Sequence, residues 1–328
     1  MTGTTTTMIA AIRDCLAGEM ARDDRVVVLG EDIGRNGGVF RATDGLLDRF
    51  GESRVFDTPI SESGIVGACI GMSLTGIVPV AEIQFAGFSA QAYHQIVGQL
   101  ARLRYRSRGR FHCPVTIRAP YGGGLRTPEH HADSVEAPYT HTPGLKVVVP
   151  STAADAKGLL ASAVRDPDPV LFLEPIPLYR HARDDVPDGE HLVELGRASV
   201  VREPSDAVVV TWGAMVPVAC DAADAIAARL GAQVGVVDLR TLAPLDIETL
   251  VAVAERAGRV VVVHEAPLTA GFGAEVVATV QEEAFYSLET PIRRVAGYDV
   301  PAPVPLVEDW FRPDTARIVA ALEAALAS

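Results

Sequence analysis

The chain is organised around the stretch Thr58–Gly71, TPISESGIVGACIG. A polar turn carries one carboxylate, Glu62, directly into a run of small and apolar residues, and no residue from Gly64 to Ala81 is charged. Because burial disfavours the ionised form of a carboxylate, we expect the pKa of Glu62 to rise toward a range that suits proton transfer. The alternative is that Ser61 or Glu62 simply caps the helix that follows. The turn alone leaves both interpretations open.

Composition limits the class of protein. The 328 residues are 48% hydrophobic and 22% charged, which is typical of two globular domains of ordinary size. A net charge of −13 makes nucleic acid a poor choice of partner. The four cysteines are scattered without a CxxC pair, which favours a reducing compartment over a disulfide framework.

The sequence also bears on location. The first residues lack a basic region followed by an apolar core, so we expect no signal peptide. Gly64–Ala81 is long enough to be considered as a membrane span, but its glycines, Ser73, Thr75 and Pro79 argue for a buried helix followed by a strand. We therefore expect a cytoplasmic protein without a membrane partner.

Short apolar runs alternate with helical patterns along the chain, which predicts an α/β fold with two open domains. We expect a first domain over residues 1–180, a linker rich in proline and charge over 181–204, and a second domain over 205–328. A single helix is expected from Ser89 to about Arg104. The expected strands are Val26–Gly30, Val78–Ile83, Val115–Pro120, Lys146–Pro150, Val170–Pro175, Ala207–Gly213, Gln233–Asp238, Arg259–Ala266 and Ile292–Val295.

Several side chains follow these strands, where ligands gather in open α/β sheets. Glu31 and Asp32 are either part of such a site or a solvated turn. Phe88 is either core packing or a platform on which a flat ring stacks. A loop with three glycines leads to His130 and His131, and a histidine there suits acid–base chemistry better than metal binding.

Other common motifs are missing. The sequence contains no GxxxxGK[ST], GxSxG or HExxH, and GFGAEV lacks the third glycine of a dinucleotide loop. A nicotinamide-dependent dehydrogenase is therefore the weaker alternative. The residues alone suggest a cofactor that needs a buried acid and a stacking surface, and they do not name it.

Along nearly its whole length the chain resembles the beta subunit of the first, decarboxylating component of 2-oxo acid dehydrogenase complexes, which depends on thiamin diphosphate. The resemblance rests on VVVLGEDIGRNGGVF, DTPISESGIVGACIGMSLTGIVPVAEIQF, FSAQAYHQIVGQLARLRYRSRG, VTIRAPYGGG, HHADSVEA, HTPGLKVVVPSTAADAKGLL and DLRTLAPLD. HEAPLTAGFGAEV and GYDVPAP look most like the branched-chain (2-oxoisovalerate) relatives. The implied fold is transketolase-like, with a pyrimidine-binding domain followed by a C-terminal domain.

The resemblance implies roles for individual residues. Glu62 would hydrogen-bond N1′ of the aminopyrimidine and so promote loss of the C2 proton. Phe88 would stack on the pyrimidine, with Gln84 and Ile60 lining the same pocket. His131 would assist acylation of the lipoyl group on the acyltransferase component. Many relatives read YHSQS where this chain has EHHADS, so His130 competes with His131, and the spacing to SVEA favours His131.

The resemblance also implies ions and partners. A structural potassium ion would lie at Val115, Ala163, Asp166 and Asp168, although Asp166–Pro167 also reads as an ordinary helix-ending turn. No GDG motif is present, so an alpha subunit would hold Mg²⁺ and the diphosphate in an α2β2 heterotetramer that is inactive as beta alone. The second domain would make the beta–beta contact and dock the acyltransferase. We expect a branched-chain 2-oxo acid as substrate; the alternatives are a pyruvate or acetoin dehydrogenase subunit and a non-catalytic scaffold subunit.

Overall fold

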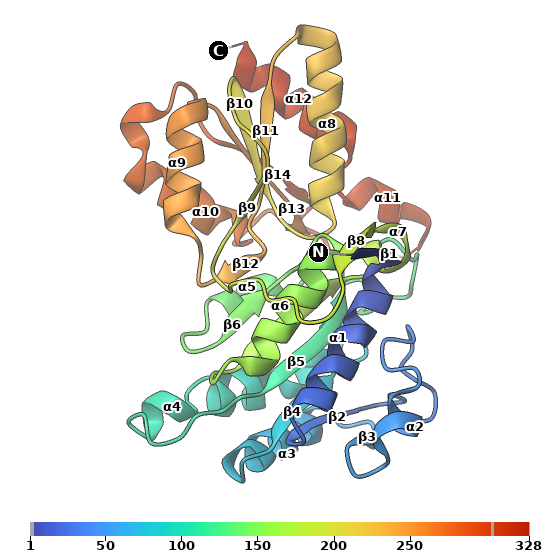
Figure 1. Ribbon diagram of the computed structural model, residues 1–328. Helices are drawn as coiled ribbons and strands as arrows, with labels where there is room; N and C mark the ends of the chain where they lie inside the picture. Colours follow the sequence, from blue (N-terminus) through green and yellow to red (C-terminus); the bar gives the residue numbers. More distant parts are fainter. Residues whose placement is uncertain (1–2, 303–304, 328) are drawn as a thin grey trace.

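The chain forms two α/β domains, each built on its own sheet, as the sequence predicts (Figure 1). The computed structural model describes residues 3–302 and 305–327. Residues 1–2 and 328, at the ends of the two expected domains, and residues 303–304 lie outside that description.

The first domain has a seven-stranded sheet in the order β12-β6-β7-β5-β4-β2-β3. Neighbours from β6 to β3 run parallel. Their apolar runs are buried on both faces, as parallel sheets covered by helices require. The strands are β2 (Val26–Gly30), β3 (Val55–Asp57), β4 (Val78–Glu82), β5 (Thr116–Tyr121), β6 (Lys146–Val148), β7 (Val170–Pro175) and β12 (Thr241–Ala243).

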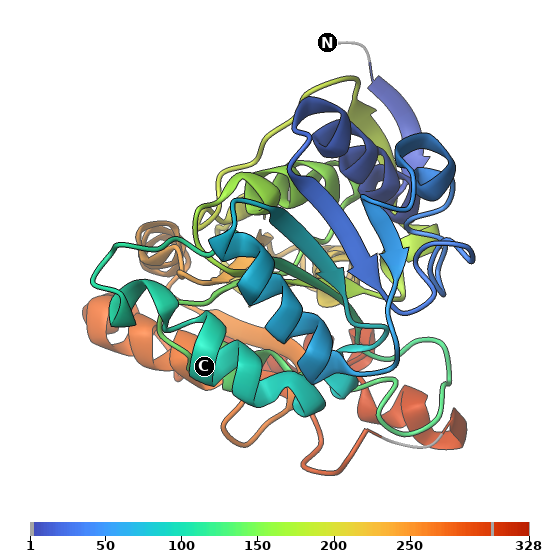
Figure 2. The same ribbon diagram turned by 90° about the horizontal axis from the view of Figure 1, so that it is seen from below.

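Helices cover both faces of this sheet (Figure 2). α1 (Met8–Arg22) and α6 (Ala153–Arg165) pack together on one face, and α3 (Glu62–Leu74) lies on the other. Alternate residues of each strand point to the two faces, so Val28 packs under α1 while Leu29 packs under α3.

The helix expected from Ser89 to about Arg104 is corrected by the structure. This segment is a 3-10 helix, η1 (Ala86–Ala92), followed by a π-helix, η2 (His94–Leu100), and a short α4 (Leu103–Arg106). The apolar spacing keeps one face buried in either form, so the sequence pattern does not separate a wide π turn from an α-helix.

The second domain has a five-stranded sheet in the order β14-β13-β10-β11-β9. Helices α8 and α12 pack on one face, and α9 and α10 pack on the other (Figure 1). The strands are β9 (Ser199–Arg202), β10 (Ala207–Thr211), β11 (Val234–Asp238), β13 (Val260–Pro267) and β14 (Arg293–Gly297). The helices are α8 (Met215–Leu230), α9 (Ile247–Ala257), α10 (Gly273–Glu283) and α12 (Thr315–Leu326).

One strand of the first domain's sheet comes from the second half of the chain. β12 follows β11 in sequence, yet it pairs with β6 of the first domain. The segment 181–204 holds two short strands: β8 (Arg183–Pro187) pairs with β1 (Gly3–Thr7), and β9 joins the second sheet beside β11. The remaining short elements are α2 (Leu46–Phe50), α5 (Glu136–Thr140), α7 (Leu178–His181), η3 (Phe285–Ser287), η4 (Pro305–Val307) and α11 (Glu308–Phe311).

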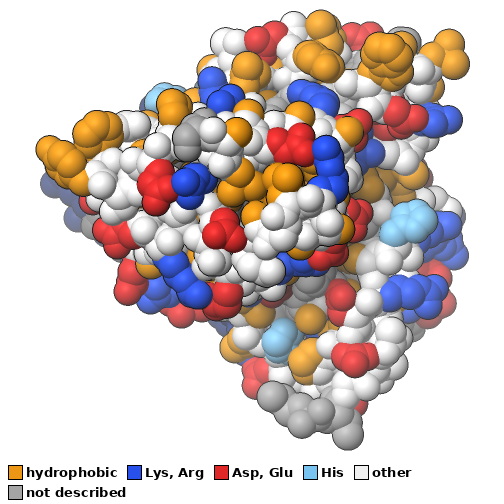
Figure 3. Space-filling model, turned by 90° about the horizontal axis from the view of Figure 1, so that it is seen from above, with side chains coloured by type: hydrophobic (Ala, Val, Ile, Leu, Met, Phe, Trp, Pro, Cys, Tyr) orange, Lys and Arg blue, Asp and Glu red, His pale blue; other side chains and the backbone are white. Residues whose placement is uncertain are grey.

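Gly64–Ala81, considered above as a membrane span, divides into most of α3 and the start of β4. In the part of the chain that the structure describes, no helix has the length and apolar character to span a bilayer. On the face seen in Figure 3, acidic, basic and apolar side chains are interspersed rather than gathered into a basic tract.

Candidate functional site

Four neighbouring parallel strands of the first domain end at one edge of its sheet. β3, β2, β4 and β5 are adjacent in that order. The segments that follow them therefore meet at this edge: Ile60–Glu62 after β3, Glu31–Asp32 after β2, Gln84–Phe88 after β4, and Gly122–His131 after β5. Every candidate from the sequence lies here except the four residues of the potassium segment.

Glu62 is the first residue of α3, and a second carboxylate lies near it. The Ser61 hydroxyl accepts a hydrogen bond from the Gly64 amide at 3.3 Å, so Ser61 caps the helix, and Glu62 is half-buried. Glu31 is buried, and within the described residues its Oε1 has no hydrogen-bond partner. Burial raises the pKa of Glu31, and the negative charge of Glu62 raises it further. This edge of the sheet therefore has two carboxyl groups near each other, and burial favours the protonated form of Glu31.

The acidic pair after β2 is divided between interior and solvent. Glu31 points inward, whereas Asp32 is exposed and accepts a hydrogen bond from Gln84 Nε2 at 3.1 Å. Asp32 adopts a φ of 58°, which turns the chain sharply after the strand. Ile60 is 83% exposed, so its side chain is accessible at this edge of the sheet, as are several other large apolar side chains on the surface of the described residues.

Phe88 belongs to an aromatic cluster at the same edge. Its ring centroid lies 5.7 Å from that of Phe85 and 5.0 Å from that of His131, both edge-on. Phe85 is buried and also contacts Phe40 at 5.6 Å, whereas Phe88 is half-buried. Edge-on packing fixes the ring planes, so Phe88 offers a rigid aromatic surface at the border of the site.

The structure distinguishes the two histidines. The His131 ring packs edge-on against Phe85, with the centroids 4.5 Å apart, and its Nδ1 lies 3.0 Å from the carbonyl oxygen of Glu129. A carbonyl can only accept, so Nδ1 carries a hydrogen, and in the neutral ring the lone pair is on Nε2. His130 is exposed, adopts a φ of 68°, and has Nδ1 3.4 Å from Asp133 Oδ2. Only His131 is held in the aromatic cluster.

A buried charge cluster lies behind the aromatic residues. Arg118 donates from Nη1 to Glu82 at 2.7 Å and from Nε and Nη2 to Glu174 at 2.7 and 2.9 Å, and all three side chains are buried. Tyr179 donates to Glu174, and its ring contacts that of Phe40. Burial opposes the charge of Arg118, but Glu174 and Glu82 more than compensate, so the pKa of Arg118 is raised. Burial also raises the pKa of Glu82, although Arg118 opposes this.

The potassium segment lies elsewhere, near the amino ends of β5 and β7. The carbonyls of Val115 and Ala163 already accept backbone hydrogen bonds, from Val170 at 3.0 Å and Asp166 at 3.2 Å. Both carboxylate oxygens of Asp166 lie 2.6 Å from Lys146 Nζ, and Asp168 pairs with Arg104. Asp168 Oδ1 is buried with no hydrogen-bond partner within the described residues, which is the one feature that fits a cation. Potassium stays a prediction.

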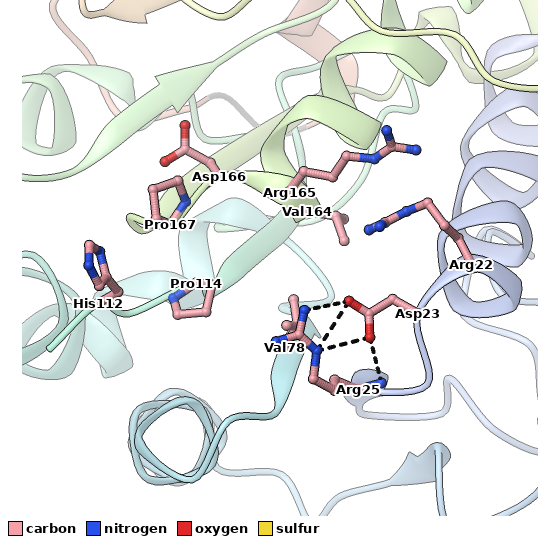
Figure 4. Close-up of a pocket in the computed structure, with 10 residues that line it drawn as sticks. All are labelled: Arg22, Asp23, Arg25, Val78, His112, Pro114, Val164, Arg165, Asp166 and Pro167. Atoms are coloured by element: carbon pink, nitrogen blue, oxygen red, sulfur yellow. Dashed lines mark hydrogen bonds and ion pairs between the residues drawn. The ribbon is translucent and has the colours of Figure 1, made fainter.

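Metal chemistry finds no other support in the described residues, where no group of three or more His, Cys, Asp or Glu side chains is arranged to hold a metal. A cavity of about 330 Å³ lies beside the potassium segment (Figure 4). Its arginines, Arg22, Arg25 and Arg165, are all paired with carboxylates, which makes them less available to an anion.

The sequence did not single out several residues that pack around the candidate site. Phe85 follows the same strand as Phe88, and the sequence pattern alone does not show that both rings belong to one cluster. Glu82, Arg118 and Glu174 did leave a signal: each is a charged residue in an otherwise apolar strand. β4 and β7 flank β5, so the two acids and the one base lie on adjacent strands.

Comparison with known proteins assigns both halves of the chain. The family described as "Transketolase, pyrimidine binding domain" matches residues 4–181, and the family described as "Transketolase, C-terminal domain" matches residues 196–318. Among curated proteins, the chain is 53% identical to "Pyruvate dehydrogenase E1 component subunit beta" of Bacillus subtilis over 94% of each chain. It is 49% identical to the protein of that name from Staphylococcus epidermidis over 98% of each chain.

Solved structures agree on the fold. "Split gene transketolase, inactive beta4 tetramer" matches with a TM-score of 0.80 and 27% identity, covering 99% of both chains. Transketolase from Leishmania mexicana matches with a TM-score of 0.71 and 19% identity, covering all of this chain and 46% of that one, which shows the fold alone. The relatives named here are pyruvate dehydrogenase subunits, so the branched-chain substrate expected from the sequence finds no support among them.

Proposed function

The chain belongs to the transketolase-like, thiamin-diphosphate-dependent beta subunits of the E1 component of 2-oxo acid dehydrogenases, and from that premise we propose that its substrate is pyruvate. In this proposal the chain forms the pyrimidine half of a site completed by an alpha subunit. The complex then decarboxylates pyruvate and transfers the acetyl group to a lipoyl group on an acyltransferase. Acetoin and branched-chain 2-oxo acids are the alternative substrates.

One arrangement carries the proposal: Glu62 begins α3 near buried Glu31, and the half-buried ring of Phe88 follows β4 at the same edge of the sheet. These residues fit a flat heterocycle that needs one hydrogen-bonding acid and one stacking surface. Thiamin diphosphate supplies, when bound, a carbon nucleophile and an electron sink for decarboxylation. Glu62 would hold the proton shared with a ring nitrogen, and Phe88 would stack on the ring. Gln84 and Ile60 would line the same pocket.

The partner follows from what this sequence lacks. No GDG segment occurs in the chain, so we assign Mg²⁺ and the diphosphate to the alpha subunit in an α2β2 complex. Ile60, on the turn that leads to Glu62, is exposed and is therefore accessible to a second chain at this edge.

We assign acyl transfer to His131. Its Nδ1–H is held by the Glu129 carbonyl, so Nε2 is the atom that can give a proton to, or take one from, a sulfur of the lipoyl group. The edge-on contacts with Phe85 and Phe88 keep the ring in place and exclude water from one side.

Replacing His131 with asparagine in the two-chain complex is expected to slow acylation of a lipoyl domain about 100-fold, which is within the range for losing one general acid–base group. Decarboxylation measured with an artificial electron acceptor should stay within about threefold of wild type, since that step does not use the lipoyl sulfur. His130→Asn is the matched control and should leave both rates unchanged. Equal effects of the two histidine variants would contradict the assignment to His131.

The substrate is tested by comparing kcat/KM for pyruvate and for 3-methyl-2-oxobutanoate in the complex with thiamin diphosphate and Mg²⁺. Extra methyl groups in a fitted pocket change binding by roughly 1–3 kcal/mol each, so we expect pyruvate to be preferred by at least about tenfold. The names of the curated relatives support this outcome. Preference for the branched acid would keep the mechanism and overturn the substrate.

A further inference from the structure

The loop that leads to His131 is held by the second domain. The backbone N–H of Gly123 donates to Glu265 Oε1 at 2.5 Å, and that of Gly124 donates to Glu308 Oε1. Glu265 lies on β13 and Glu308 begins α11, so both carboxylates come from the C-terminal domain and reach a loop of the first. We call this contact the glycine clasp: Gly122–Gly124 with Glu265, Glu308 and Arg312.

The clasp explains two of the three successive glycines, Gly122 and Gly123, whereas a Cβ on Gly124 would first meet Pro177, 2.6 Å from its Cγ. A Cβ on Gly122 would lie 3.2 Å from both carboxylate oxygens of Glu265, and Gly122 has a φ of 81°. A Cβ on Gly123 would lie 2.9 Å from Glu308 Oε1 and 3.0 Å from Arg312 Cδ. A side chain at Gly123 would displace the side chains of Glu308 and Arg312 from the loop, so Gly122 and Gly123 serve close approach rather than mobility.

The hydrogen bonds of the clasp are accepted by carboxylates that are almost completely buried. Glu265 is 5% exposed and Glu308 is 1% exposed, and Arg312 Nε lies 3.4 Å from Glu265 Oε1. A hydrogen bond from an N–H to a buried carboxylate is stronger than a neutral one, and the buried acceptor is costly to leave unpaired. The neighbouring pair Arg126–Asp309 also joins the domains, but both side chains are about two-thirds exposed, and such pairs contribute little.

The opposite end of the same loop is also fixed. A Cβ on Gly87, at the start of η1, would overlap the carbonyl oxygen of His130, so the loop lies directly on that backbone. Gly122 N donates to the carbonyl of Asp133 at 3.4 Å, which closes the loop on itself. His131 therefore sits between a support in its own domain, Gly87, and a clasp made by the other domain.

We propose that Glu265 and Glu308 are positioning residues for acyl transfer: from the C-terminal domain they hold the glycine clasp, and through it they fix the loop that carries His131. This rests on the role assigned above to His131. The C-terminal domain then takes part in the reaction through the loop, without a side chain of its own at the reacting atoms. Removing one acceptor should loosen the loop and slow the step that needs His131, while decarboxylation continues.

The test uses the complete two-chain complex with Glu308→Ala, Glu308→Gln and Asp309→Ala. Three quantities are measured: backbone hydrogen exchange of residues 122–131, decarboxylation with an artificial acceptor, and acylation of a lipoyl domain. We expect Glu308→Ala to increase exchange at the Gly124 amide and to slow lipoyl acylation about tenfold, with decarboxylation within twofold of wild type. Glu308→Gln keeps an acceptor oxygen and should restore most of the protection and rate. Asp309→Ala should match wild type in all three.

A second variant changes the clasp on its first-domain side. Gly123→Ala places a methyl group against Glu308 and Arg312, and it should give the same pattern even if Glu308→Ala fails to assemble. Unchanged exchange in both variants, or equal slowing of both half-reactions, would overturn the proposal. If His131→Asn leaves lipoyl acylation intact while Glu308→Ala increases exchange, the clasp stands as a structural contact, and the role of His131 is what fails.

Discussion

Replacing Glu62 with glutamine in the complete complex is expected to reduce pyruvate decarboxylation about 1,000-fold. Glutamine keeps the size of the side chain and the cap by Ser61, but it can neither carry the negative charge nor exchange the proton. A positioned acid or base contributes roughly 100- to 10,000-fold, and Glu62 is proposed to act before every later step. The measurement is kcat at saturating thiamin diphosphate and Mg²⁺, together with the exchange rate of the cofactor's C2 hydrogen.

Glu52→Gln is the matched control for this prediction. Glu52 is an exposed carboxylate on the turn before β3, away from the carboxyl ends of the strands, and its loss should leave kcat unchanged. A Glu62→Gln complex that binds cofactor and keeps more than about a third of wild-type kcat would show that Glu62 is only a helix-terminal charge.

Replacing Arg118 with methionine is expected to destabilise the protein by about 3–5 kcal/mol. Methionine has a similar length, but it leaves Glu82 and Glu174 buried without their cation, and removing one partner of a buried pair has about this effect. Thermal unfolding of the two-chain complex should shift down by roughly 10 °C, and Arg180→Met, at an exposed arginine, should shift it little.

The loss of stability in Arg118→Met should depend on pH because the pKa of Glu82 is raised in the folded protein. Burial raises the pKa of folded Glu82 above its unfolded value, and removing Arg118 raises it further. A carboxyl group of this kind favours the folded state below its unfolded pKa and loses that contribution as pH rises through the folded pKa. The deficit of Arg118→Met should therefore shrink from pH 8 to pH 5, and Glu82→Gln with Glu174→Gln should recover part of it. A constant deficit, or one below about 1 kcal/mol, would contradict the role of the cluster.

Much of the fold is readable from local patterns. The strand Val26–Gly30 matches β2, and helix α6 begins where Thr152 caps it, because apolar runs and caps act over a few residues. The turn at Ser61–Glu62 was placed correctly for the same reason. The 3-10 and π segments of η1 and η2 were not predicted, because one buried face is compatible with several helix types.

Contacts between distant segments could not be predicted. β12 leaves its own domain to pair with β6, and Glu265 reaches Gly123 across 142 residues. Neither depends on a local pattern. The glycines at 122–124 signalled that something approaches closely, but the sequence did not say what. The ion pair between Asp166 and Lys146 also joins segments that are apart in the sequence. It engages a carboxylate that the sequence suggests as a potassium ligand.

The central claim is that this chain is one half of a thiamin-diphosphate site. The most direct test is pyruvate decarboxylation by the purified chain, by an alpha subunit, and by the two together, each with thiamin diphosphate and Mg²⁺. Turnover only in the mixture is the predicted result. Turnover by this chain alone, or none from an assembled complex that binds the cofactor, would contradict it.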